Sequence, residues 1–106
     1  MAILERVDRN AVAYLTLNSP ERLNALSDEM LEALQTTFDK FHKDTSIRAV
    51  VLRGAGKAFC AGHDLKQMTK ARKQKDGGAA IFKDLFDRCA SFMQTVQNIP
   101  QPVIAQ

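Results

Sequence analysis

The stretch AVVLRGAGKAFCAGHDLKQM, residues 49–68, decides the fold of this chain and contains its most informative candidate site. Its first four residues form a continuous apolar run, which is typical of a strand in a parallel sheet with both faces covered. Gly54, Gly56 and Gly62 follow, and a helical turn is expected at residues 64–66. We therefore predict a junction from strand to helix with exposed backbone amides.

The chemistry expected at this junction is the binding of negative charge. The first N–H groups of a helix have no partner within the helix, and the helix dipole favours an anion beside them. Gly62 permits a tight turn and the close approach of a ligand. The site can therefore hold a phosphate or a developing oxyanion. Its spacing matches neither the dinucleotide fingerprint nor the phosphate loop, so the spacing alone does not identify a ligand.

The rest of the chain predicts a single α/β domain over residues 1–106. An amino-terminal hairpin with its turn at residues 8–10 precedes right-handed βαβ units. The pattern predicts strands at residues 3–7, 11–17, 49–52 and 103–105, and helices at residues 27–44 and 78–98. Ser27 is expected to cap the first helix. The second helix is expected to bury one apolar stripe formed by Phe82, Leu85, Phe86, Cys89, Phe92, Met93 and Val96.

Composition excludes several classes of protein. With 45% hydrophobic and 25% charged residues, the chain is not of the intrinsically disordered type. No apolar run approaches the roughly 18–20 residues of a membrane helix, and Glu5 and Asp8 interrupt any export signal. Cys60 and Cys89 cannot form a disulfide framework, and no metal-ligand cluster surrounds them. We expect a cytoplasmic protein that uses no membrane, metal or resident cofactor.

The net charge of +3 is small, but the basic residues are unevenly distributed. Residues 65–75 contain no acidic side chain and five basic ones, Lys66, Lys70, Arg72, Lys73 and Lys75. One interpretation is a solvated loop, and the other is a contact surface for a phosphorylated ligand. No aromatic residue is interleaved in this run, so nucleic-acid binding is not expected.

Four blocks, NSPERLNAL (18–26), RAVVLRG (48–54), KAFCAGHDL (57–65) and PVIA (102–105), follow one another along the chain. In this order they resemble the amino-terminal part of the enoyl-CoA hydratase/isomerase (crotonase) superfamily. The resemblance implies a fold of β-β-α turns wound into a spiral and an acyl-CoA thioester as substrate. For a full-length chain it also implies a homo-oligomer, either a trimer or a hexamer.

The resemblance also implies the site residues. Family members stabilise an enolate-like intermediate with two backbone N–H groups, and the first of these maps onto the N–H of His63. The implied contacts with the substrate come from Arg22, Leu23, Ala25, Ala61, His63, Asp64, Leu65 and Lys66. Other interpretations stay open: Asp64 as a helix cap, Arg22 and Lys66 as ordinary surface residues, and the His63 imidazole as a base without a visible partner.

The chain also departs from the family pattern. The second N–H donor is expected in a Gly-rich segment after Pro102–Ala105, and the acid/base glutamates are expected further on. We therefore expect these residues to form the amino-terminal part of the domain and half of a site. The favoured function is the hydration or isomerisation of a 2-enoyl-CoA. The alternative is a CoA-binding or assembly module without catalysis, because the acid/base residues are lacking.

Overall fold

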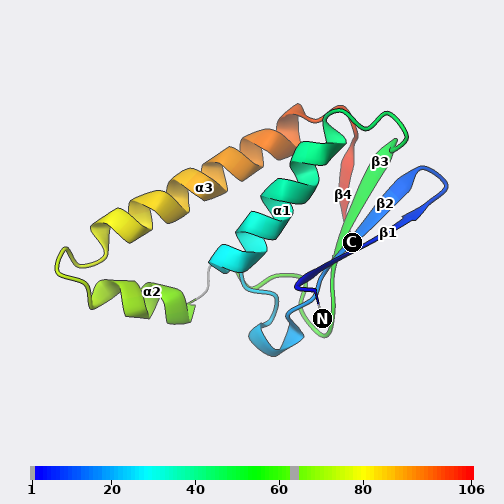
Figure 1. The fold of residues 1–106 in the computed structure, drawn as a ribbon. Helices are drawn as coiled ribbons and strands as arrows, with labels where there is room; N and C mark the ends of the chain where they lie inside the picture. Colours follow the sequence, from blue (N-terminus) through cyan, green and yellow to red (C-terminus); the bar gives the residue numbers. More distant parts are fainter. Residues whose placement is uncertain (1, 63–64) are drawn as a thin grey trace.

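A computed structural model describes residues 2–62 and 65–106. The elements are β1 (Leu4–Arg9), β2 (Val12–Leu17), the short 3-10 helix η1 (Pro20–Arg22), α1 (Asp28–Phe41), β3 (Ala49–Gly54), α2 (Leu65–Arg72), α3 (Ala79–Asn98) and β4 (Val103–Ala105). The strands form one sheet in the order β1-β2-β3-β4, and α1 and α3 lie on the same side of it (Figure 1). The α/β class is confirmed.

The sheet combines a hairpin with two parallel crossovers. β1 is antiparallel to β2, whereas β2 and β3, and β3 and β4, are parallel. The expected βαβ units are therefore present. The turn between β1 and β2 is shorter than predicted, with Asn10 and Ala11 as its two residues at φ 52° and 66°. A two-residue turn with both φ positive matches the right-handed twist of the paired strands, which explains why β1 continues to Arg9.

The beginning of α1 matches its prediction. The Ser27 hydroxyl accepts a hydrogen bond from the Met30 backbone N–H at 3.2 Å, and Asp28 and Glu29 lie in the first turn, where the helix dipole favours carboxylates. The helix ends at Phe41 and not at residue 44. Its apolar stripe is fully buried and consists of Met30, Leu31, Leu34, Phe38 and Phe41.

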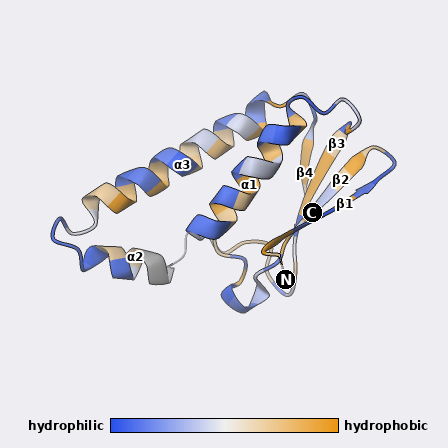
Figure 2. Ribbon diagram, viewed as in Figure 1, coloured by the Kyte–Doolittle hydropathy of each residue, from blue (hydrophilic) through white to orange (hydrophobic). Residues whose placement is uncertain are grey.

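The main core lies between α1, α3 and one face of the sheet. The ring of Phe38 packs edge-on against Phe41 and Phe92, with centroids 5.5 and 5.1 Å apart. From β2, Ala13 and Leu15 reach the same core and are completely buried. β2, β3 and β4 are largely hydrophobic, whereas the outer strand β1 is mostly hydrophilic (Figure 2).

The prediction for α3 was right in its bounds and partly wrong in its buried stripe. Leu85 and Phe92 are buried, but 55% of Phe86 and 52% of Met93 is exposed. Cys89 is only partly buried, and this burial raises the pKa of its thiol. α1 covers only one side of α3, so the apolar stripe is wider than the surface available to bury it.

The sheet face opposite α1 and α3 carries an apolar row that crosses all four strands. Val7, Tyr14, Val51 and Ile104 are paired in register along this row. Val7 is 52% exposed and Ile104 is 53% exposed. The prediction that β3 has both faces covered was therefore wrong for the described residues, because α1 and α3 occupy the same face (Figure 1).

A carboxylate ahead of α3 caps this helix. Gly78, at the N-cap position, has no side chain to offer, and Asp76 accepts hydrogen bonds from the backbone N–H groups of Gly78 at 2.9 Å and Ala80 at 3.1 Å. The bonds from Ala80 and Gly78 lower the pKa of Asp76, since they stabilise its charged form.

We expect Phe38→Ala to lower the free energy of unfolding by about 3–5 kcal/mol, because it removes the ring that joins α1 to α3 and leaves a cavity. Urea denaturation followed by circular dichroism measures the change. Thr36→Ala, on the exposed side of the same helix, is the control and is expected to leave stability nearly unchanged. Equal effects for both variants would contradict this account of the core.

We expect Asp76→Ala to destabilise the start of α3 at neutral pH. Because the pKa of Asp76 is lowered in the folded state, its stabilisation is complete above the unfolded pKa and is lost as pH falls through the folded pKa. The difference in stability between wild type and variant should therefore shrink in acid. Denaturation curves across this pH range test the sign, with Lys75→Ala as the neighbouring control.

Candidate functional site

Two loops leave the sheet at the same edge. The first loop, residues 18–27, follows β2, and the second loop, residues 55–62, follows β3. β2 and β3 are parallel neighbours, so both loops begin at the carboxyl ends of their strands. In open α/β sheets, ligands bind beyond the carboxyl ends of the strands. This edge is therefore the candidate site.

Backbone hydrogen bonds join the two loops to each other. The Ala61 N–H donates to the Leu23 carbonyl at 3.0 Å, and the Leu26 N–H donates to the Gly62 carbonyl at 2.5 Å. At the end of the strands, the Ala55 N–H donates to the Leu17 carbonyl at 2.9 Å. The loops therefore behave as one paired unit and not as two independent segments.

The side chain of Asn24 adds a third connection between the loops. It is completely buried, and its amide group binds the backbone of both loops. Asn24 adopts φ 53°, a left-handed conformation in which asparagine is enriched. This residue was not among those predicted to form the site. The signal available in the sequence was an asparagine directly between two candidate residues, Leu23 and Ala25.

The structure brings four of the predicted site residues together on the paired loops. Arg22 ends η1 and is exposed. Leu23 is 45% exposed, Ala25 is partly buried, and Ala61 is exposed on the second loop. The hydrogen bond between Leu23 and Ala61 makes the candidate residues of the first loop direct neighbours of the one on the second loop.

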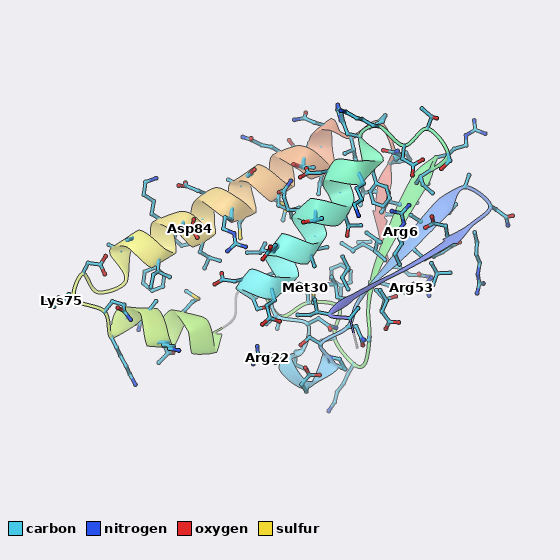
Figure 3. The ribbon with its side chains drawn as sticks, viewed as in Figure 1. Arg6, Arg22, Met30, Arg53, Lys75 and Asp84 are labelled. Carbon is cyan, nitrogen blue, oxygen red and sulfur yellow. The ribbon has the colours of Figure 1, made fainter. Side chains whose placement is uncertain are left out.

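Four other predicted residues follow the second loop. His63 and Asp64 lie outside the described residues, so their roles stay predictions. Leu65 and Lys66 begin α2, which extends to Arg72 and is longer than the expected turn. The interpretation of the basic run as a loop was therefore wrong for this part. Lys75 lies at the turn between α2 and α3, far from Arg22, so the basic run is not gathered in one place at the site (Figure 3).

Gly54 allows the second loop to fold back over the end of β3. A Cβ atom at Gly54 would collide with the Phe59 carbonyl oxygen and would lie 2.6 Å from that of Ala58. At Gly62 the reason for glycine is different, since φ is 90° and a Cβ atom there would meet no other atom within 4 Å. Glycine at position 54 therefore leaves space for the second loop, and glycine at position 62 permits the positive φ.

An apolar groove adjoins α2. It has a volume of about 260 Å³ and lies between α2 and α3 beside Asp28 at the start of α1. Its apolar lining consists of Met68, Ala71, Ile81, Phe82 and Leu85. α2 starts three residues after Gly62, so the groove lies on the segments that follow the second loop in the chain.

Hydrogen bonds within the first loop stabilise the negative charge of Glu21, the residue before Arg22. The Glu21 backbone N–H and the Ser19 hydroxyl lower the pKa of the Glu21 carboxyl, and the hydroxyl lies 3.0 Å from it. Glu21 therefore stays ionised next to Arg22.

Within residues 2–62 and 65–106, no cluster of three His, Cys, Asp or Glu side chains is arranged to hold a metal ion. No helix in this part of the chain is long and apolar enough to cross a membrane.

These features define an α/β domain with two paired loops at the carboxyl ends of its strands, where ligands bind in this class of fold. Comparison with known proteins identifies its family. The family model described as enoyl-CoA hydratase/isomerase matches residues 12–106. The chain belongs to the enoyl-CoA hydratase/isomerase family. It is 40% identical over 105 residues to the putative enoyl-CoA hydratase/isomerase YngF of Bacillus subtilis, covering 98% of this chain and 38% of YngF.

Two further comparisons show the breadth of the relatives. The chain is 34% identical over 104 residues to the mitochondrial 3-hydroxyisobutyryl-CoA hydrolase of Rattus norvegicus, covering 97% of this chain and 26% of the hydrolase. The crystal structure of an enoyl-CoA hydratase of Mycobacterium smegmatis matches with a TM-score of 0.86 and 46% identity, over 97% of this chain and 38% of that one. The chain therefore spans less than two-fifths of the length of these relatives, and the expected crotonase-type fold is confirmed.

We expect Gly54→Ala to lower the free energy of unfolding by about 1–3 kcal/mol, because the added methyl group collides with the backbone of residues 58 and 59. The second loop must move, so the backbone N–H of Ala61 should lose protection against hydrogen exchange. Ala33→Gly, in the middle of α1, lowers stability by another route and should leave the Ala61 N–H protected. Unchanged protection in Gly54→Ala would contradict the close packing of this loop.

Proposed function

We propose that the paired loops bind an acyl-CoA thioester and belong to a hydratase or isomerase that acts through an enolate. The observation that carries the proposal is the direct bonding of the first loop to the second at the carboxyl edge of the sheet. The family resemblance associates both loops with CoA. Relatives named as enoyl-CoA hydratase/isomerase and as a CoA-thioester hydrolase support the same class of substrate.

In the proposed mechanism, the backbone N–H of His63 donates to the thioester oxygen as negative charge develops on it. A donor of this kind contributes about 3–4 kcal/mol to the stability of a transition state, because the charge is stronger there than in the bound substrate. The second donor and the acid/base carboxylates are assigned to none of the motif positions in this chain. We therefore propose that these residues supply the amino-terminal half of the site.

The remaining parts of the substrate fit the surrounding chemistry. The Arg22 guanidinium can form paired, charge-assisted hydrogen bonds with a CoA phosphate. The apolar groove of about 260 Å³ beside α2 suits an acyl chain, since its lining is formed mainly by aliphatic and aromatic side chains. Substrate binding is thus proposed to use the loops for the polar part and the groove for the apolar part.

The second candidate is a CoA-binding module without catalysis. The family resemblance places the acid/base glutamates further along than the blocks matched here, and a CoA-binding module does not require them. Both candidates require binding of CoA, and only the enzyme requires turnover. Measuring binding and turnover on one sample therefore separates them.

The test is calorimetric titration of the protein with CoA and acetyl-CoA, together with a crotonyl-CoA hydration assay and the intact mass of the natural protein. Binding with hydration supports the enzyme, and binding without hydration supports the module. We expect Arg22→Ala to weaken CoA binding about tenfold, the effect of one charge-assisted hydrogen bond. Arg9→Ala, at the distant hairpin turn, is the matched control. Absence of CoA binding by the wild type would overturn the proposal.

A further inference from the structure

We infer that Asn24 is the positioning residue of the candidate site, and this inference rests on the proposed function. Its side chain holds the first loop against the second, so that Arg22 and Leu23 keep a fixed place relative to Ala61. Asn24 itself is completely buried and is not assigned a contact with the ligand. Its effect on binding therefore passes through the backbone of the two loops.

The hydrogen bonds of Asn24 use both ends of its amide group. The Oδ1 atom accepts from the Ser19 N–H at 2.8 Å. The Nδ2 atom donates to the carbonyl oxygens of Ala55 at 2.9 Å and Ala58 at 2.8 Å. These two carbonyls lie 31 and 34 residues further along the chain. Both amide hydrogens are therefore committed to the second loop.

Each of these bonds fixes backbone that carries a candidate residue. The Ser19 carbonyl accepts from the N–H groups of Arg22 at 3.0 Å and Asn24 at 2.9 Å, which closes the first loop into a compact turn. The carbonyls of Ala55 and Ala58 lie in the first half of the second loop, six and three residues before Ala61. A displaced Asn24 side chain would remove hydrogen bonds from both loops at once, whereas loss of an exposed residue would affect only one loop.

The position requires an amide and not merely a polar group of the same size. One side of the pocket presents a single N–H donor, and the other side presents two carbonyl acceptors. A carboxylate has the same shape but no hydrogen to donate, so it would face two oxygens with negative charge. Protonation of the carboxylate would return one O–H donor. Because burial raises the pKa of an introduced carboxyl group, lowering the pH should protonate it.

Gln101 provides a matched control at the opposite end of β3. It is 5% exposed, and its Nε2 atom donates to the carbonyls of Phe41 at 2.8 Å, Asp44 at 3.0 Å and Ile47 at 3.1 Å. It therefore joins the end of α1 to the segment that precedes β3. Both residues are buried amides bound to backbone carbonyls, but only Asn24 binds the candidate loops.

The experiment compares Asn24→Asp with Gln101→Glu by calorimetric titration with CoA, after denaturation curves have confirmed that both are folded. Both variants should lose stability. At neutral pH only Asn24→Asp should weaken CoA binding, by at least tenfold, and lowering the pH should restore part of this loss relative to wild type. If a buried carboxylate prevents folding, Asn24→Ala and Gln101→Ala are compared in place of the two carboxylate variants.

Hydrogen exchange of the Ala61 N–H supplies a readout that does not depend on CoA. It should lose protection in Asn24→Asp and keep it in Gln101→Glu. Failure of the wild type to bind CoA, with the Ala61 protection changed as expected, would reject the proposed function and retain the role of Asn24 in holding the loops. Equal loss of affinity in both variants, or unchanged affinity and protection in Asn24→Asp, would overturn the inference.

Discussion

The parallel pairing of β2 with β3 is the constraint on which the rest of the structure depends. A parallel pair cannot be joined by a tight turn, so the chain must cross from one end of the sheet to the other through α1. The crossover buries the α1 stripe against the sheet and creates the core around Phe38. It also places the ends of β2 and β3 side by side, which brings the first and second loops together. The fold and the candidate site thus have a common cause.

The candidate site is built mainly from backbone groups. The bonds from Ala61 to Leu23 and from Leu26 to Gly62 are main-chain bonds, and Asn24 binds only main-chain atoms. Main-chain bonds hold the two loops in positions that do not depend on a flexible side chain. The site can therefore keep its polar geometry while exposed side chains on the loops vary.

The features predicted correctly from the sequence are those fixed by local chemistry. The apolar run at residues 49–52, the Ser27 cap and the bounds of α3 depend on neighbours within a few residues. The exposure of Phe86 could not be predicted in this way, because it depends on how far α1 covers α3. The short hairpin turn was missed because Ala11 carries no signal for a positive φ.

The candidate site divides in the same manner. Family resemblance selected Arg22 and Ala61, and the structure brings their loops together. It did not assign Asn24 a contact with the substrate, and the role of Asn24 in joining the loops emerges only when residues more than thirty positions apart become neighbours. The oxyanion role of His63 stays a prediction. A motif can therefore name the residues that meet a ligand more readily than the residues that hold them in place.

The sheet topology also has a consequence for the order in which the chain folds. The hairpin of β1 and β2 is local and can form early, whereas pairing of β3 requires closure of a long loop. The bonds from Asn24 span 31 and 34 residues and become available only after this closure. Contacts of large sequence separation slow folding. The first and second loops can therefore be joined only once β2 and β3 have paired, whereas the hairpin requires only neighbouring residues.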